Sequence, residues 1–350
     1  MSFVDAYAAF SAKEPLRPFQ LQRRNVDKDD VQIEILYSGV CHSDIHSARN
    51  EWGGAVYPLV PGHEILGKVT KVGNNVKKFK VGDTVGVGCM VNSCGECTSC
   101  DQKLEQYCNK GCTFTYNSLD KDGKSQTYGG YSKEIVVRES FVLRIPENLP
   151  LDKAAPLLCA GITTYSPLRQ WKVKAGDKVG VVGLGGLGHM AVKIAVAMGA
   201  EVTVISSSDK KKEDAKKFGA KGYINSKNPE EFAKNANQLD FMINTVAADM
   251  DLTPYLSLLK LDCTMVQVGA PDKPNTVGMF PLIGRRRRLA GSMIGGIEET
   301  QEMLDFCGKY NVLPETELIP MEKINEAYER MIKGDVRYRF VIDIKAMKST

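Results

Sequence analysis

Residues 178–212 read KVGVVGLGGLGHMAVKIAVAMGAEVTVISSSDKKK, and the prediction for the second half of the chain begins with them. An apolar run ends at Gly183, a segment with helical periodicity follows, and a second apolar run ends at Ser206. This order predicts a strand, a helix and a parallel second strand. Apolar runs at 240–246 and 263–270 continue the alternation, so we expect an α/β fold with a doubly wound parallel sheet.

Residues 183–188, GLGGLG, fit the pattern G-x-G-x-x-G between a predicted strand and a predicted helix. In this context Gly183 permits the tight turn, Gly185 lets the backbone approach a pyrophosphate, and Gly188 lets the helix pack on the strand. The helix N-terminus then faces the phosphates. The alternative is a glycine-rich turn without a ligand, but the flanking elements favour a dinucleotide site.

The end of the second strand predicts which dinucleotide is bound. Folds specific for NAD place an acidic residue there for the ribose 2′-hydroxyl, whereas this chain has Ser206 and Ser207, followed by three lysines. Without the carboxylate, a 2′-phosphate is not repelled, and the hydroxyls and Lys211 supply donors and positive charge. We therefore predict NADP(H). Lys210 and Lys212 have an equally good alternative as the exposed face of the next helix.

The first 150 residues contain short apolar runs broken by glycine and proline, which predict an antiparallel, barrel-like β unit. The predicted strands cover 31–40, 65–73, 83–89 and 133–145. After about residue 295 the periodicity predicts two helices, a loop between them and a final strand. These last elements cover 299–310, 323–334 and 338–344.

Four cysteines lie within 15 residues in the order Cys94, Cys97, Cys100 and Cys108. Clustered thiolates at this spacing form a closed tetrahedral site, and zinc is the natural metal in a non-redox setting. An iron–sulfur cluster is the main rival. Spacing alone leaves Cys112 open as the fourth ligand. Because protein atoms fill every position, this zinc would be structural.

A second ligand set is dispersed along the chain. A catalytic zinc needs about three protein ligands and one open position, and Cys41, His63 and Cys159 would supply two thiolates and one imidazole. Spacing alone does not choose these three. Their competitors are His42, His46, His189 and Cys89.

Composition limits the remaining function classes. The chain has 350 residues, ten cysteines and a net charge of +4. Its N-terminus resembles no secretory signal, so we expect a cytoplasmic protein whose cysteines bind metal or do chemistry. With no run of about 18 apolar residues, no membrane span is expected. The basic run 285–288 is too short to predict a nucleic-acid surface and fits a solvated turn.

Several longer motifs resemble the zinc-containing medium-chain alcohol dehydrogenases, over essentially the whole chain. The closer similarity is to cinnamyl alcohol dehydrogenases and their microbial relatives. The motifs are GVCHSDIH at 39–46, PLVPGHE at 58–64, APLLCAGITTYSPL at 155–168, VISSSDKKKEDA at 204–215 and DVRYRFVID at 335–343.

The resemblance implies a β-rich GroES-like catalytic domain, residues 1–159 and 295–350, and a Rossmann NADP-binding domain, residues 160–294. It implies that Cys41, His63 and Cys159 hold the catalytic zinc, that Glu64 can approach it, and that Asp44 accepts a hydrogen bond from the His63 ring. It also implies a homodimer. It selects Cys108 as the fourth structural ligand and places near the cofactor Thr163, Gly186, Leu187, Val268, Gly269 and Arg339.

The activity so implied is hydride transfer between NADP(H) and primary alcohols or aldehydes, with two zinc ions per chain. Ser43 would pass a proton through the cofactor ribose to His46, which exchanges it with water. Plant enzymes carry a tryptophan where this chain has Phe114. Together with Trp52 and Met293, Phe114 would line the substrate pocket, which favours a broad aromatic or medium-chain aldehyde range.

Two alternatives belong to other classes. A zinc-free quinone or enone reductase shares the cofactor fold but lacks both metal sites, so metal analysis separates it. A zinc ribbon that binds nucleic acid would give a salt-dependent gel shift. Neither explains both cysteine sets together with the glycine motif.

Overall fold

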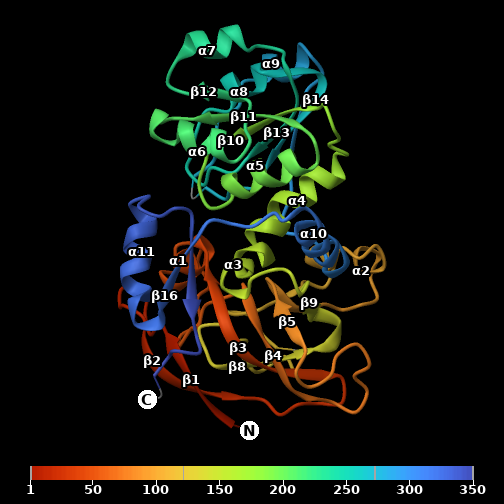
Figure 1. Cartoon of the computed structure of the whole chain (residues 1–350), viewed down its shortest axis with the longest axis vertical. Coiled ribbons are helices and arrows are strands. Elements are labelled where there is room, and N and C mark those ends of the chain that lie inside the picture. The colour runs from red at the N-terminus through yellow and green to blue at the C-terminus, as the bar shows by residue number, and fades with distance from the viewer. Residues whose placement is uncertain (1, 121, 272, 349–350) are drawn as a thin grey trace. The chain divides into compact units, whose positions relative to one another are not determined.

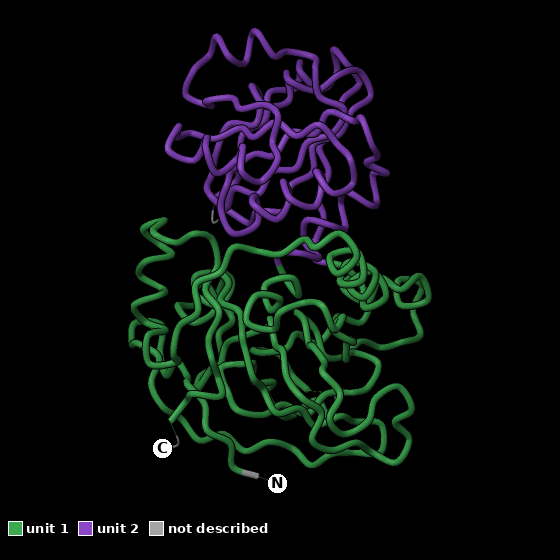
Figure 2. Tube along the Cα trace, in the orientation of Figure 1, with its two compact units in different colours: residues 1–159, 295–350 green, residues 160–294 purple. Residues whose placement is uncertain are grey.

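The computed structural model describes residues 2–120, 122–271 and 273–348. The chain divides into two compact units, residues 1–159 with 295–350 (unit 1) and residues 160–294 (unit 2), as Figure 2 shows. In the described part of the chain, no helix combines the length and the apolar character that a membrane span requires.

Unit 2 contains a six-stranded sheet in which all neighbours are parallel. The spatial order is β12-β11-β10-β13-β14-β15, so the chain starts in the middle, builds one edge, and returns to build the other. This confirms the doubly wound prediction, with a switch point between β10 and β13. The strands are β10 (Lys178–Val182), β11 (Glu201–Ser206), β12 (Gly222–Asn225), β13 (Leu239–Asn244), β14 (Leu259–Gln267) and β15 (Arg288–Gly291).

Helices complete unit 2 and bury its sheet. The strands read as continuous apolar runs because helices cover the parallel sheet; α5 packs on β10 and β11, and α8 packs on β14 (Figure 1). Within α5, Met190, Ala191, Val192 and Ile194 are all fully buried. The helices are α4 (Ala160–Gln170), α5 (Gly188–Ala197), η4 (Asp209–Lys211), α6 (Lys212–Lys217), α7 (Pro229–Lys234), α8 (Thr253–Ser257) and α9 (Met279–Ile283).

Unit 1 is built on a seven-stranded sheet with the order β16-β17-β3-β4-β5-β9, to which β8 adds by pairing with β3. All pairs are antiparallel except β16 with β17. Its strands are β3 (Asp30–Val40), β4 (Ile65–Val72), β5 (Thr84–Val87), β8 (Glu134–Arg138), β9 (Leu143–Arg144), β16 (Thr316–Pro320) and β17 (Arg339–Asp343).

Two small sheets and several helices complete unit 1. The small sheets pair β1 (Ser2–Ala8) with β2 (Arg17–Arg23) and β6 (Met90–Asn92) with β7 (Thr113–Phe114). The helices are α1 (His42–Ala48), α2 (Thr98–Asp101), η1 (Glu105–Tyr107), η2 (Glu139–Phe141), α3 (Leu151–Ala154), η3 (Ala155–Leu158), α10 (Ile297–Tyr310), η5 (Met321–Lys323) and α11 (Ile324–Ile332).

Three neighbouring strands meet at one corner of this sheet. β3 ends at Val40, β4 begins at Ile65, and β17 begins at Arg339. The register aligns Ser38 with Ile65 and Val40 with Phe340. Residues just outside these strand ends are therefore brought together, and the metal-binding motifs predicted from the sequence flank them.

Two predictions of local structure were wrong. The segment 133–145 is not one strand: β8 pairs with β3 and β9 pairs with β5, with the turn η2 between them. The Glu139 carboxylate accepts hydrogen bonds from the backbone of Lys77 and Lys78 and holds this turn. The predicted loop between the last two helices contains β16, which exists because β17 offers it a parallel partner.

The basic run 285–288 is largely exposed and begins in a turn, as the sequence predicts, and it also makes specific contacts. Arg286 pairs with Asp262, and Arg287 donates to the carbonyl oxygens of Leu259 and Pro281, each at 2.8 Å. Arg287 thereby connects the start of the edge strand β15 to β14 and α9.

Candidate active site

One buried cluster gathers four possible metal ligands in unit 1. Ligand atoms of Cys41, His63, Glu64 and Cys159 lie within 4.8 Å of one another, and all four residues are buried. Cys41 stands between β3 and α1, His63 and Glu64 immediately precede β4, and Cys159 follows η3. The structure therefore brings together the three predicted ligands and Glu64.

The sulfur atoms of this cluster are spaced for a metal. Cys41 Sγ and Cys159 Sγ lie 3.9 Å apart, close to the edge of about 3.8 Å that a tetrahedron with Zn–S bonds of about 2.3 Å requires. A disulfide would need about 2.05 Å. The hydrogen bond with Cys159 lowers the pKa of Cys41 well below its ordinary value, while that of Cys159 is raised. One thiol of the pair is thus ready to ionise, as a zinc ligand must.

Asp44 lies behind His63 and orients its ring. His63 Nδ1 is 3.1 Å from Asp44 Oδ1, which leaves Nε2 to face a metal. Burial lowers the pKa of His63, but the charges of Asp44 and Cys89 and the hydrogen bonds with Asp44 and Cys41 together outweigh burial and raise the pKa well above its usual value. Asp44 is fully buried and acts on the ligand rather than on the substrate.

Glu64 and Arg339 form a buried ion pair in this unit. Burial raises the pKa of Glu64 to about 7, although the charge of Arg339 opposes the rise. Glu64 Oε2 has no hydrogen-bond partner among the described residues, which suits an oxygen that can turn toward a metal. A Cβ on Gly39 would lie 1.8 Å from this oxygen. The predicted contact of Arg339 with cofactor phosphates stays a prediction.

The four clustered cysteines also fit a metal. Ligand atoms of Cys94, Cys97, Cys100 and Cys108 lie within 4.8 Å of one another, with Sγ–Sγ distances of 3.9 Å for Cys94–Cys100, 3.6 Å for Cys97–Cys100 and 4.0 Å for Cys97–Cys108. The donated hydrogen bond from the Asn109 backbone lowers the pKa of Cys97 to about 6. The four sulfur atoms of this four-cysteine lobe are therefore spaced for a closed tetrahedral metal site.

Cys112 lies outside that set and hydrogen-bonds the Gln106 carbonyl oxygen at 3.9 Å. Burial raises the pKa of Cys112. The lobe is joined to the rest of unit 1 at α10, because Glu105 Oε2 accepts a hydrogen bond from Ile297 N at 3.1 Å.

The predicted relay residues lie on α1. Ser43 Oγ is 3.6 Å from Cys41 Sγ, beside the cluster. His46 Nδ1 is 2.5 Å from Glu51 Oε2, and its ring stacks on Trp52 with centroids 4.7 Å apart. The sequence analysis did not single out Glu51, and only its place one turn beyond His46 could have pointed to it.

Only one of the three predicted pocket residues is placed against the relay. Trp52 is about half exposed and stacks on His46. Phe114 on β7 in unit 1 and Met293 in unit 2 are both exposed on their own units. Their place in a pocket stays a prediction.

In unit 2 the glycine motif forms the turn between β10 and α5. Gly183 has φ +86°, and a Cβ on Gly188 would lie 2.1 Å from the Gly183 carbonyl oxygen. Both positions therefore require glycine for the fold itself. A Cβ on Gly185 would meet nothing within 4 Å, so its space is open for a ligand such as a pyrophosphate.

The strand end that predicts the dinucleotide lies beside this turn. β11 ends at Ser206, which is mostly buried, and Ser207 is exposed. Lys211 Nζ donates to the Leu184 carbonyl oxygen at 2.8 Å, so Lys211 reaches the glycine turn. Lys210 and Lys212 are exposed. Lys211 thus shares a neighbourhood with the motif, as a 2′-phosphate ligand should.

Four of the other predicted cofactor residues lie at the same edge of the sheet or in the glycine turn. Val268 N and Gly269 N both donate to the Asn244 carbonyl oxygen at the end of β13, at 3.0 and 3.1 Å. Gly186 and Leu187 belong to the turn itself, and Thr163 lies on α4 with 7% of its surface exposed. Carboxyl ends of parallel strands beside a switch point form the usual cofactor crevice.

Two family models match the chain: the alcohol dehydrogenase GroES-like domain at residues 27–147 and the zinc-binding dehydrogenase at residues 186–309. NADP-dependent alcohol dehydrogenase C 1 of Mycolicibacterium smegmatis is 58% identical over 350 residues, which is all of both chains. Aldehyde reductase YahK of Escherichia coli is 54% identical over 347 residues, 98% of this chain and 99% of its own.

Solved structures agree with these matches. The cinnamyl alcohol dehydrogenase SbCAD4 of Sorghum bicolor superposes with a TM-score of 0.97 at 46% identity, over 100% of this chain and 99% of its own. The cinnamyl alcohol dehydrogenase of Helicobacter pylori, solved with NADP(H), gives 0.93 at 47% identity over 99% of both chains. The resemblance drawn from the motifs is confirmed: the chain belongs to the zinc-binding medium-chain alcohol dehydrogenases, in the branch of the cinnamyl alcohol dehydrogenases.

Proposed function

We propose that this protein reversibly oxidises primary alcohols to aldehydes with NADP(H) and zinc. The observation that carries the proposal is the buried set of Cys41, His63 and Cys159, with Asp44 bonded to the histidine ring. A zinc-free quinone or enone reductase lacks such a ligand set. Analysis of bound metal, with two zinc ions per chain expected, tests the proposal.

Cys41, His63 and Cys159 would hold the catalytic zinc, which when bound polarises the oxygen of an alcohol or aldehyde. Glu64, which forms an ion pair with Arg339, would be close enough to approach this zinc. The four-cysteine lobe would hold the second zinc, which has no position open for substrate.

Ser43 and His46 move the proton between the alcohol and water. Ser43 lies beside Cys41, and it would accept the alcohol proton while it releases its own hydroxyl proton toward His46. Glu51 binds His46 Nδ1 and so leaves Nε2 for the transfer.

In unit 2 the glycine turn and the start of α5 bind the pyrophosphate, and Ser206, Ser207 and Lys211 bind the 2′-phosphate. The nicotinamide supplies or accepts the hydride when NADP(H) is bound.

Replacement of His46 by glutamine should slow turnover mainly at neutral and lower pH, because hydroxide and buffer replace the relay at high pH. General acid–base steps contribute about 10²–10⁴-fold, and a relay that borders solvent belongs at the lower end, about 10²-fold or less. The measurement is kcat between pH 6 and 10 in two buffers. A pH profile identical to that of the wild type would remove His46 from the mechanism.

The substrate range we infer is aromatic and medium-chain aldehydes. Trp52 supplies an exposed aromatic wall next to the relay, and similar proteins include an aldehyde reductase and cinnamyl alcohol dehydrogenases. A panel of cinnamaldehyde, benzaldehyde, and C4 to C8 aldehydes, assayed with NADPH, tests it. Activity on short aldehydes alone would contradict it.

We infer a homodimer whose interface is on unit 2. The helix α9 and the edge strand β15 expose apolar side chains: Phe280 is 82% exposed, Ile283 69% and Met279 58%. Such an apolar surface beside an edge strand suits a second copy. Sedimentation equilibrium should give twice the chain mass of 38.5 kDa, and a monomer mass at micromolar concentration would contradict the inference. Cytoplasmic location rests on composition and stays a prediction.

A further inference from the structure

A buried tyrosine hydroxyl lies behind the metal-ligating histidine. Tyr131 is fully buried, and its hydroxyl donates to Asp44 Oδ2 at 3.2 Å. On the same oxygen, Asp44 accepts from Cys41 N at 2.9 Å. Asp44 Oδ1 accepts from His63 Nδ1 and Gly62 N, each at 3.1 Å. Each carboxylate oxygen is therefore held by two donors.

These donors differ in what a substitution can change. Those of Cys41 and Gly62 are backbone groups, and that of His63 belongs to a metal ligand. Tyr131 alone supplies a side-chain donor that can be removed without altering a ligand or the backbone. Without its hydroxyl, Oδ2 keeps one donor and the carboxylate is less firmly oriented toward His63.

The segment that carries Tyr131 also supports the loop that carries His63. Gly129 N donates to Val60 O at 2.8 Å, Gly130 N to Gly62 O at 2.8 Å, and Tyr131 N to Pro61 O at 3.0 Å. A Cβ on Gly129 would lie 2.3 Å from the Gly62 carbonyl oxygen. The two segments thus lie against each other along three successive residues.

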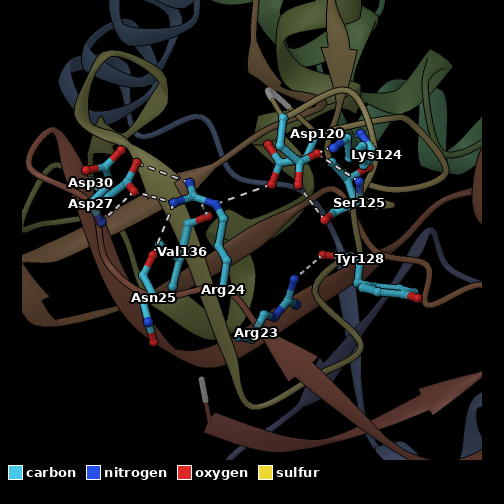
Figure 3. A network of polar contacts seen from close by, with 12 residues as sticks. Arg23, Arg24, Asn25, Asp27, Asp30, Asp120, Lys124, Ser125, Tyr128 and Val136 are labelled. Carbon is cyan, nitrogen blue, oxygen red and sulfur yellow. Dashed lines mark hydrogen bonds and ion pairs between the residues drawn. The ribbon is translucent and has the colours of Figure 1, made fainter.

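Arg23 anchors this segment from the other side. It donates to Tyr128 O at 2.7 Å, as Figure 3 shows, to Gly129 O at 3.0 Å, and to Glu134 O at 2.9 Å. The guanidinium is buried, and its desolvation lowers the pKa of Arg23 to about 9. A buried charge bound to three carbonyl groups indicates that the position of residues 128–134 is tightly fixed.

We propose that Tyr131 is a positioning residue of the catalytic metal centre, which acts through Asp44 to hold His63 in its ligating orientation and so slows the loss of zinc. The proposal rests on the proposed function, in which Cys41, His63 and Cys159 hold that zinc. Tyr131 is fully buried and is not one of the clustered ligands, so we expect its effect on retention of the metal.

The experiment compares zinc release from wild-type and Tyr131→Phe holoenzymes, each loaded with two zinc ions, into a chromogenic chelator. Partners of metal-ligating histidines change metal affinity by about 10–100-fold. Because three donors to Asp44 remain, we expect the catalytic zinc to leave about 10-fold faster. The four-cysteine lobe is an internal control, and its zinc should leave at the wild-type rate. With excess zinc, kcat should stay within about twofold of the wild type, as for a residue without a part in the chemistry.

Tyr116→Phe is the matched control. It removes another buried hydroxyl near His63, one that hydrogen-bonds Ser47 Oγ at 3.4 Å and leaves Asp44 untouched. Wild-type release from both sites is expected. If Tyr131→Phe does not fold, Arg23→Lys tests the same segment and should accelerate release from the catalytic site alone.

Three results would overturn the proposal: unchanged release in Tyr131→Phe, equal acceleration at both sites, or the same acceleration in Tyr116→Phe. Failure of the proposed function looks different, because the wild type would then hold only the zinc of the four-cysteine lobe.

Discussion

Replacement of Cys159 by serine should leave a folded protein with one zinc ion per chain and almost no activity. A neutral hydroxyl does not replace the thiolate, and Cys41 and His63 alone give two of the about three ligands that a catalytic zinc needs. Polarisation of the substrate oxygen is worth several kcal/mol, and each 1.36 kcal/mol is a factor of ten. We expect a loss of at least about 10³-fold in kcat/KM.

Cys97→Ser is the reciprocal variant. It should also lose one zinc, but the closed lobe contributes to folding, and the lobe holds the start of α10 through Glu105 and Ile297. The expected effect is a lower thermal unfolding temperature, with kcat of the surviving folded protein close to normal. Cys112→Ser, which alters a cysteine outside both sets, should keep two zinc ions and normal behaviour.

Zinc content, thermal unfolding and kcat/KM are measured for all three variants. Two zinc ions and normal turnover in Cys159→Ser would disprove the catalytic set. A stable Cys97→Ser protein with one zinc would show that the lobe is dispensable for folding.

Replacement of Ser206 by aspartate should reverse the preference of the enzyme from NADPH toward NADH. The carboxylate would stand at the end of β11, where the 2′-phosphate is expected, and would accept hydrogen bonds from the 2′-hydroxyl of NADH. Loss of one or two charge-assisted hydrogen bonds, together with repulsion, should cost NADPH about 2–4 kcal/mol, or about 30–1,000-fold. The change should be in KM, because the 2′ group is remote from the reacting carbon.

A pair of lysine variants controls for general charge effects. Lys211 reaches the glycine turn, whereas Lys212 is exposed. Lys211→Met should therefore raise the KM for NADPH, and Lys212→Met should not. The measurement is kcat/KM with both cofactors in all four proteins. If the wild type already favours NADH, or if Ser206→Asp leaves the ratio unchanged, the serine–lysine interpretation is wrong.

The parts of the fold that the sequence predicts are those whose cause is local. The apolar runs of β10 and β11 and the turn at Gly183 follow from neighbouring residues, and the doubly wound sheet is confirmed. The strand β16 could not be predicted, because its side chains alternate poorly between buried and exposed. It forms a strand only because β17, more than twenty residues later, lies beside it.

The candidate site likewise has a part that the local sequence predicts and a part that depends on distant residues. Spacing suggests the four-cysteine lobe but does not choose between Cys108 and Cys112, since both are within reach along the chain. Glu64 and Arg339 are 275 residues apart, and their ion pair leaves no local pattern. Tyr131 is likewise 87 residues from Asp44. Only the folded sheet, which brings distant strand ends to one corner, reveals these partners.

The glycine turn of unit 2 shows how selection would act on neighbouring positions. Because a side chain at Gly188 collides with the Gly183 carbonyl oxygen, most alleles altered there would lower the abundance of the protein itself. A side chain at Gly185 meets open space, so alleles altered there would leave a normal amount of folded protein, which would be inactive if the proposed pyrophosphate binds there. In a homodimer such chains would still assemble with normal ones. If the proposed homodimer forms, a cell with both normal and altered copies would carry mixed dimers when the altered residue is Gly185, and few when it is Gly188.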